Sequence, residues 1–173
     1  MIRAFSEIGD PDARLLIGGE DKTVAGGGIM SELRAAIDAD PRISVLGMLR
    51  GQELDNFYAS IDVFTLPSVA ESFGIVQAEA IMLGIPSITS DIPGGRYPVL
   101  ATGLGRLVPP GDHEALVEAM RTLPTYFDRQ TRQASALVAR QMFGAENFLD
   151  AHEELLVGGR PVVSAQPKTP EES

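Results

Sequence analysis

Short apolar runs alternate with longer amphipathic stretches through most of this chain, and each short run ends in turn residues. Short apolar runs bounded in this way are typical of strands that are buried on both faces of a parallel sheet. The predicted strands cover residues 15–17, 43–46, 63–66 and 87–89, with a weaker candidate at 105–108. Their alternation with helical stretches predicts an α/β fold, a Rossmann-like parallel sheet flanked by helices.

The longer stretches carry apolar residues at helical spacing and are predicted to be helices. These cover residues 30–39, 53–60, 74–83, 113–123, 129–142 and 145–157. Gly84 follows the third helix as a glycine suited to end it, and Asp112 is placed to cap the start of the fourth. The stretch 20–28 is predicted to be a loop, because its three glycines match neither a phosphate loop nor a dinucleotide fingerprint.

The length and composition suit one domain. The chain has 173 residues, 44% of them apolar, and shows no internal repeat or second core. From Gly158 onward the sequence has no helical or strand period and contains several Pro and Ser residues. We therefore expect a Rossmann-like domain over residues 1–157 and a flexible tail over 158–173.

Charge and residue usage exclude several function classes. The net charge of −10 argues against a broad nucleic-acid surface, and the absence of cysteine excludes disulfides, thiolate catalysis and thiolate metal sites. His113 and His152 have no partners at metal-binding or general-base spacing, so both are expected at the surface, and neither a metal nor a cofactor is predicted. The chain has no signal peptide and no apolar run of about 18 residues, which predicts a cytoplasmic protein that could rest on a membrane without crossing it.

The segment 67–84 carries the pattern with the most chemical content. It leaves the carboxyl end of a strand, turns and at once begins a helix, at the sheet edge where open α/β sheets bind ligands. The main-chain N–H groups of Phe73, Gly74 and Ile75 are expected to be unpaired at the helix start and to point toward an anion. Because Gly74 has no side chain, a ligand can come close to the backbone there. The geometry predicts a phosphate site that needs no basic side chain.

Two carboxylates, Glu71 and Glu79, flank this position. Repulsion keeps both from facing a phosphate directly, but each can accept hydrogen bonds from hydroxyls, which a nucleotide sugar carries on both sides of its diphosphate. Alternatively, Glu71 is an acid that interacts favourably with the helix dipole, and Glu79 lies on an ordinary exposed helix face. Ligand binding is favoured because Gln77 and Glu79 are the only polar side chains of this helix, and a carboxylate on a buried helix needs a partner.

The run Glu71-Ser-Phe-Gly-Ile-Val-Gln-Ala-Glu79 resembles the paired-glutamate motif of the retaining glycosyltransferases called group 1 or family 4. Flanking segments resemble the same family in the same order over residues 1–157. The resemblance implies two Rossmann-like domains facing across a cleft. The carboxyl-terminal domain, which this chain resembles, binds the nucleotide-sugar donor, and the amino-terminal domain binds an acceptor glycan or lipid.

The resemblance also implies roles for single residues. Glu79 would hold the ribose hydroxyls, and Glu71 would contact the donor sugar as the catalytic position. Ser72 lies with Phe73, Gly74 and Ile75 in the turn whose amides would hold the distal phosphate. Met48, Leu49 and Arg50 would frame the base, largely through the backbone. For Arg50 a solvated loop arginine is the favoured interpretation over direct phosphate contact.

The chain departs from the family pattern in two places. It begins with a segment that resembles the helix after the family's phosphate-binding Arg and Lys, so we expect the first strand, those basic residues and the acceptor domain to be missing. That strand would lie between the strands at Leu15 and Val63, whose edges would stay unpaired or meet directly. After Asp91, Arg96 and Tyr97 replace the usual continuation of a loop, and Arg96 is either a cation near the ligand or, as we favour, a surface residue.

Two functions follow as hypotheses. The first is the donor-binding domain of a glycosyltransferase that transfers a hexose with retention, inactive or nearly so as an isolated chain. The second is a non-catalytic nucleotide-binding or scaffold module that another chain completes. A dehydrogenase is disfavoured because no G-x-G-x-x-G follows a strand. The donor base, the sugar, the acceptor and the oligomeric state are not predicted.

Overall fold

The computed structural model describes residues 1–19 and 28–144. The elements in order are α1 (Ile2–Ser6), β1 (Leu15–Gly18), α2 (Gly28–Ala39), β2 (Ile43–Gly47), α3 (Gln52–Ser60), β3 (Phe64–Leu66), α4 (Ile75–Met82), β4 (Ser87–Ser90), α5 (Pro93–Thr102), β5 (Gly105–Val108), α6 (His113–Tyr126) and α7 (Arg129–Phe143). The predicted loop at 20–27, the predicted helix at 145–157 and the predicted tail lie outside the described residues. All five predicted strands are confirmed, each within a residue at either end.

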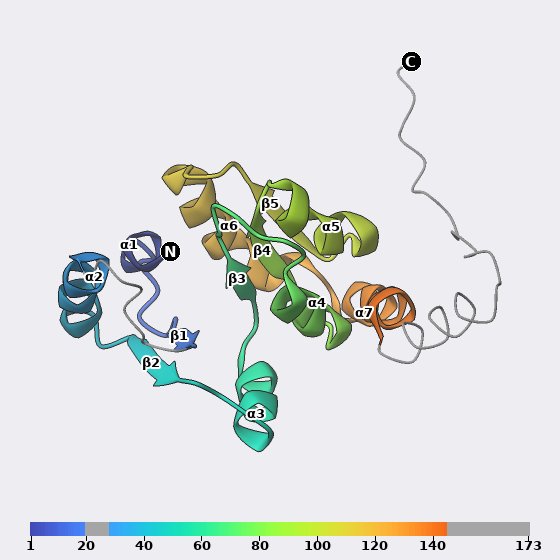
Figure 1. The fold of residues 1–173 in the computed structure, drawn as a ribbon, viewed down its shortest axis with the longest axis horizontal. Coiled ribbons are helices and arrows are strands. Elements are labelled where there is room, and N and C mark those ends of the chain that lie inside the picture. Colours follow the sequence, from blue (N-terminus) through green and yellow to red (C-terminus); the bar gives the residue numbers. More distant parts are fainter. Residues whose placement is uncertain (20–27, 145–173) are drawn as a thin grey trace, which may run out of the picture.

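The strands form two parallel sheets rather than one. Strands β3, β4 and β5 pair in that order, and β1 pairs with β2 (Figure 1). Ile88 at the centre of β4 lies opposite Thr65 of β3 and Arg106 of β5. Of the two expected outcomes for the strands at Leu15 and Val63, a direct meeting does not occur, because no ladder joins β1 to β3. One edge of each of these two strands therefore lacks a strand partner within the described part of the chain.

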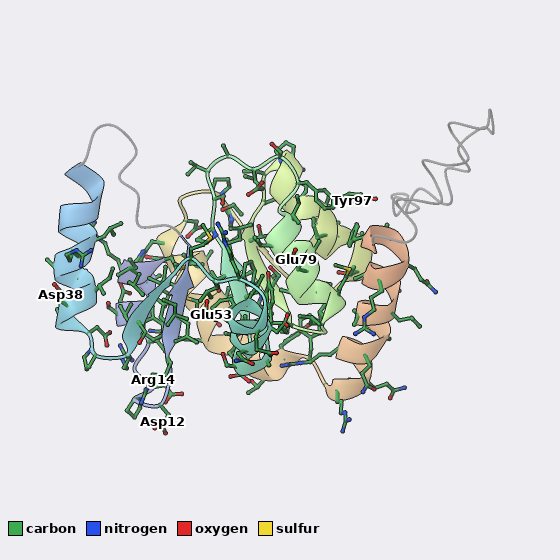
Figure 2. All side chains as sticks on the ribbon, turned by 60° about the horizontal axis from the view of Figure 1, so that its bottom comes forward. Asp12, Arg14, Asp38, Glu53, Glu79 and Tyr97 are labelled. Carbon is green, nitrogen blue, oxygen red and sulfur yellow. The ribbon has the colours of Figure 1, made fainter. Side chains whose placement is uncertain are left out.

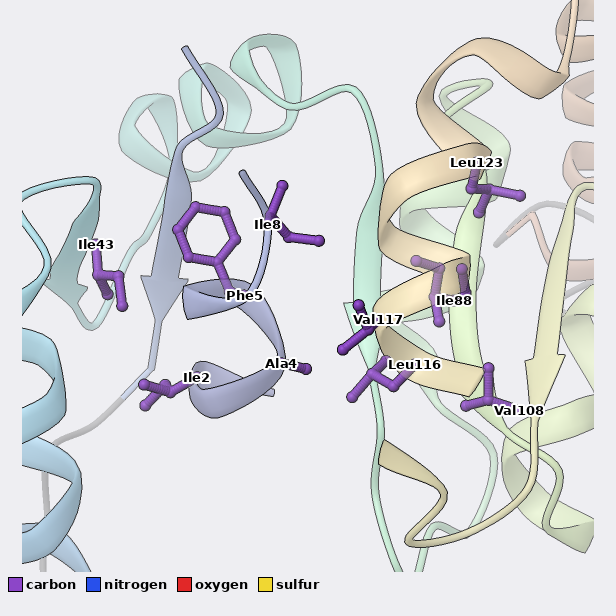
Figure 3. Packing of buried hydrophobic residues seen from close by; sticks show 11 residues of the cluster. Ile2, Ala4, Phe5, Ile8, Ile43, Ile88, Val108, Leu116, Val117 and Leu123 are labelled. Carbon is purple, nitrogen blue, oxygen red and sulfur yellow. The ribbon is translucent and has the colours of Figure 1, made fainter. Parts of the chain in front are cut away.

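Helices cover both faces of the three-stranded sheet, and this places two clusters of buried side chains. On one face, Ile88 and Val108 of the sheet pack with Leu116 and Val117 of α6 (Figure 3). On the other face, α4, α5 and α7 pack around a cluster of fully or almost fully buried residues, to which the segment before β5 adds Leu104: Ile81, Val99, Leu104 and Ala139. Strand β4 is buried along its whole length, as expected for a central parallel strand with helices on both faces.

Helix α1 joins the two-stranded sheet to this core. Its residues Ala4 and Phe5, followed by Ile8, belong to the same buried cluster as the α6 side chains (Figure 3). Arg42, just before β2, ties the end of α1 to the strand: its guanidinium lies 2.7 Å from Asp40 Oδ2, donates to the carbonyl of Ile8 at 2.6 Å and stacks over the Phe5 ring. The pairing with Arg42 also lowers the pKa of Asp40, first through the side-chain hydrogen bond.

The predicted helix ends are confirmed. Gly84 follows α4 with a φ of 81°, and the N–H of Ile85 returns to the carbonyl of Ala80 at 3.0 Å, so the helix ends in a Schellman turn. Asp112 accepts a hydrogen bond from the N–H of Ala115 at 2.9 Å and caps α6, which continues through Pro124 to Tyr126.

One element was predicted wrongly. Residues after Asp91, expected to form a loop, instead form helix α5 from Pro93 to Thr102. Two consecutive glycines and an internal Pro98 give this segment a poor intrinsic helix propensity. The structure shows why it is helical: Pro93 suits the first helical position, and Gly95, Pro98 and Val99 are buried against neighbouring elements, so tertiary packing outweighs local propensity.

Candidate functional site

The candidate site begins at the turn that leads from β3 into α4. Gly74 is buried and takes a left-handed conformation, with φ 72° and ψ 53°, directly before the first helical residue, Ile75. Within the described chain, no group accepts a hydrogen bond from the main-chain N–H of Phe73, Gly74 or Ile75. The helix start is therefore an array of unpaired donors, the arrangement that favours an anion. The identity of the anion that these N–H groups bind stays a prediction.

Helix α5 and three aromatic rings hold this turn in place. The Cα of Gly94 approaches so closely that a Cβ on it would lie 1.8 Å from the carbonyl oxygen of Glu71. The ring of Phe73 packs at centroid distances of 6.2 Å from Tyr97 of α5 and 5.6 Å from Phe143 of α7 (Figure 2 labels Tyr97). Sequence reasoning missed this cluster, because nothing in the spacing of Tyr97 or Phe143 connects them to the motif.

Glu79 lies in the middle of α4 and has a partner that the sequence did not reveal. The hydroxyl of Tyr58, on α3, lies 2.8 Å from Glu79 Oε2 and 3.2 Å from the carbonyl of Val76. Tyr58 is only 6% exposed, and burial, reinforced by hydrogen bonding to Glu79, raises the pKa of its phenol. Glu79 itself is partly exposed (Figure 2). Tyr58 thus fixes one carboxylate oxygen of Glu79.

The two glutamates of the motif have different hydrogen-bond partners in the structure. Glu71 Oε1 accepts a hydrogen bond from the N–H of the next residue, Ser72, at 2.9 Å, whereas Glu79 pairs with Tyr58. No described hydrogen bond or ion pair gives the two carboxylates a common partner. The predicted binding of one ligand by both carboxylates therefore stays a prediction.

A buried amide lies directly beside the turn. Gln77 is fully buried, and neither its Nε2 nor its Oε1 atom has a hydrogen-bond partner among the described residues. A Cβ on Gly74 would lie 3.0 Å from Gln77 Oε1, so the amide occupies the space that a larger residue at position 74 would need. Close packing thus adds to the left-handed φ in requiring glycine at this position.

The residues predicted to frame the base belong to the other sheet. Met48, Leu49 and Arg50 follow β2, and Leu49 packs against the end of β1, where a Cβ on Gly18 would lie 3.1 Å from Leu49 Cδ1. Met48 and Arg50 are exposed. Because β1 and β2 are not laddered to β3, the predicted base turn and the predicted phosphate turn are carried by two separate sheets.

A small cavity of 160 Å³ lies at the carboxyl edge of the three-stranded sheet. Residues at or just after the ends of the strands line it, including Pro67, Ser90 and Pro109, together with Met1 and His113. Neither motif glutamate lines it.

Two side chains near the candidate site, His113 and Arg96, pair with carboxylates. His113 is exposed, as predicted, and its Nε2 atom lies 2.6 Å from Glu7 Oε1, a partner too distant in sequence to be foreseen. His152 lies outside the described residues. The guanidinium of Arg96 pairs with Asp91 at 2.9 Å.

No described helix is long and apolar enough to cross a bilayer, and no three described acids or histidines gather into a metal site. The cytoplasmic location stays a prediction.

Comparison with known proteins decides the family. Residues 1–125 match the family described as "Glycosyl transferases group 1". The chain belongs to this family. This group 1 glycosyltransferase chain is 30% identical over 164 residues to a D-inositol 3-phosphate glycosyltransferase of Rhodococcus erythropolis. The match covers 88% of this chain and 35% of the relative. It is 38% identical over 99 residues to the sulfoquinovosyl transferase SQD2 of Arabidopsis thaliana, covering 55% of this chain and 19% of that protein.

Solved structures support the fold of this glycosyltransferase chain. HepE of Anabaena, in complex with UDP, superposes with a TM-score of 0.78 at 22% identity, covering 90% of this chain and 43% of the other. The sucrose-phosphate synthase of Thermosynechococcus elongatus gives a TM-score of 0.73 at 24% identity, covering 91% and 42%. The chain thus spans less than half of each of these relatives, and the predicted Rossmann-like α/β fold is confirmed.

Proposed function

We propose that this chain is the nucleotide-sugar-binding domain of a glycosyltransferase that transfers a hexose with retention of configuration. Family membership supports the transferase chemistry, and the unpaired N–H groups at the start of α4 are the observation that carries the assignment of the site. Helix starts of this kind bind phosphate without basic side chains, which suits a protein with a net charge of −10.

In the proposed mechanism, the residues of the turn stabilise the leaving diphosphate. The amides of Phe73, Gly74 and Ile75 donate hydrogen bonds to the distal phosphate, where negative charge grows as the glycosidic bond breaks. The sugar passes through an oxocarbenium-like state. Glu71, in the turn itself, accepts hydrogen bonds from the sugar hydroxyls.

Glu79 is proposed to bind the ribose hydroxyls. Tyr58 fixes Glu79 Oε2 at 2.8 Å and makes no described contact with Oε1, so the second carboxylate oxygen is available to a ligand. Tyr58 is therefore a positioning residue for the nucleotide. A nucleoside diphosphate is the natural first probe, because the structurally similar HepE is in complex with UDP.

We propose that the isolated chain binds the donor and transfers little or no sugar. It spans at most 43% of the length of the compared glycosyltransferase structures, and the acceptor glycan or lipid would be bound by residues outside this domain. A transfer assay with radiolabelled donor sugars measures this directly, and robust turnover by the chain alone would contradict the proposal.

Isothermal titration calorimetry with UDP, GDP and UDP-glucose tests the binding site. Glu79→Gln is expected to weaken binding of at least one nucleotide roughly tenfold, as loss of a charge-assisted hydrogen bond predicts. Glu53→Gln is the matched control, because Glu53 is an exposed acid in the first turn of α3. Equal affinities in wild type, Glu79→Gln and Glu53→Gln would reject the role of Glu79.

A second function, a nucleotide-binding or scaffold module completed by another chain, is favoured by one observation. The predicted base turn and phosphate turn lie on two sheets that no ladder connects, and β1 and β3 each have an unpaired edge within the described chain. Under this hypothesis the isolated, folded chain binds nucleotide weakly or not at all, and affinity appears when the completing chain is added. Tight binding by the isolated chain favours the first function.

A further inference from the structure

A second candidate site lies at the opposite end of α4 from the proposed donor site. A cavity of 430 Å³ is bounded by Leu83 and Gly84, where α4 ends, and by the side chains of Arg129, Arg132, Gln133 and Arg140 on α7. Its volume is within the range of small-molecule sites, about 300–1,000 Å³. Because α4 starts at the carboxyl edge of the sheet and ends just before β4, this cavity lies at the other edge of the sheet.

Two of the three arginines are held in fixed positions by main-chain carbonyls. Arg132 donates through Nε to the carbonyl of Phe127 at 3.1 Å and through Nη2 to that of Pro124 at 2.7 Å. Arg140 donates through Nε to the carbonyl of Met82 at 2.7 Å. These acceptors lie at the carboxyl-terminal ends of α4 and α6, and they fix the orientation of the two guanidinium groups.

Within the described residues, Arg129 and Arg132 have no carboxylate partner, and the neighbouring Asp128 uses its carboxylate to accept the N–H of Thr131 at 2.7 Å. Three cationic side chains around one cavity are unusual in a protein that has only fourteen basic residues and a net charge of −10. Guanidinium groups present planar pairs of donors that match the oxygens of a phosphate.

We propose that this cavity binds a phosphate group carried by a small anion, separately from the nucleotide-sugar site. Two kinds of molecule carry such a phosphate, a soluble phosphorylated compound and an anionic lipid with its headgroup. Leu83 at the rim of the cavity and Leu137 on α7 are 56% and 57% exposed, which would let a lipid surface contact apolar side chains beside the cations.

Calorimetry with inorganic pyrophosphate and co-sedimentation with vesicles distinguish the two carriers. Wild type, Arg129→Gln and Arg14→Gln are compared, each first checked by circular dichroism for an unchanged fold. Arg129 is exposed, so its loss leaves the core intact, and Arg14→Gln removes the same charge from the far side of the molecule (Figure 2 labels Arg14). Vesicles of phosphatidylglycerol are compared with vesicles of phosphatidylcholine, and pyrophosphate titrations are repeated with saturating UDP.

A soluble carrier predicts pyrophosphate binding that Arg129→Gln weakens roughly tenfold, that Arg14→Gln leaves unchanged and that UDP does not displace. A lipid carrier predicts binding to phosphatidylglycerol vesicles with the same dependence on Arg129 and none to phosphatidylcholine. Either pattern supports the site. The proposal is overturned if neither probe binds, if the two variants weaken binding equally, or if UDP displaces the pyrophosphate, since the last result places the anion in the donor site at the start of α4.

Discussion

The contact between Gly94 and the Glu71–Ser72 backbone gives the sharpest test of how α5 supports the candidate site. A Cβ on Gly94 would lie 1.8 Å from the carbonyl oxygen of Glu71 and 2.6 Å from that of Ser72. Real Cβ contacts essentially never fall below 3.0 Å, so Gly94→Ala requires the turn and the helix to separate by about 1.2 Å. Both partners are backbone, and no change of rotamer can relieve the overlap.

The expected cost combines two opposing effects. Overpacking of a tight contact costs about 1–3 kcal/mol, and more where the backbone must move. Alanine in place of glycine inside a helix stabilises the folded state by about 0.5–1 kcal/mol. We therefore expect Gly94→Ala to lower the free energy of unfolding by about 2 kcal/mol. Because the displaced turn carries the donor amides, UDP affinity is expected to fall as well.

Urea unfolding followed by circular dichroism measures the first effect, and calorimetry with UDP measures the second. Gly9→Ala is the matched control, since a Cβ at Gly9 meets nothing within 4 Å and its backbone is not left-handed. The control is expected to stay within about 0.5 kcal/mol of wild type. A Gly94→Ala protein as stable as the control would refute the close approach of α5 to the turn.

Three further substitutions test separate parts of the structure. Gly74→Ala, at a φ of 72°, is expected to cost about 1–2 kcal/mol in urea unfolding, and an unchanged midpoint would argue against the left-handed turn. Burial and Glu79 raise the pKa of the Tyr58 phenol, so the folded state keeps a proton that the unfolded state releases near pH 10. The free energy of unfolding that this proton contributes is fully present below pH 10 and falls by about 1 kcal/mol between pH 10 and 11. Tyr58→Phe is expected to lack this fall, so parallel pH profiles of the two proteins would contradict the prediction. Asp112→Ala is expected to lower the thermal midpoint by removing the cap on the N–H of Ala115, at about 1 kcal/mol, whereas Asp112→Asn keeps the cap and most of the stability.

The strands and most helices could be predicted because local patterns determine them. Ile43 and Ile88 lie in short apolar runs between turn residues, and Gly84 and Asp112 mark helix ends through chemistry that acts within a few residues. Helix α5 could not be predicted in this way. Its glycines and Pro98 argue against a helix locally, and only burial against distant elements makes the helical conformation favourable.

The candidate site shows the same difference between local features, which could be predicted, and long-range contacts, which could not. The unpaired amides around Gly74 follow from a strand, a turn and a helix start, all readable from the sequence. The partner of Glu79 is different, because Tyr58 precedes it by 21 residues and meets it only through the packing of α3 on α4. Phe143, which follows Phe73 by 70 residues, likewise meets it only in the folded structure. Long-range contacts of this kind leave no periodic signal.

The absence of a ladder between β1 and β3 has a consequence for how the molecule opens. The described main-chain hydrogen bonds stay within the β1–β2 part, with α1, or within the three-stranded part; none joins the two. What holds them together is side-chain packing of Phe5 and Ile8 near α6, with Glu7 linked to His113 and Arg121. The two parts can therefore separate in a partial unfolding step. Because a two-stranded sheet on its own is only marginally stable, amide protons of β2 would then exchange with solvent sooner than those of β4.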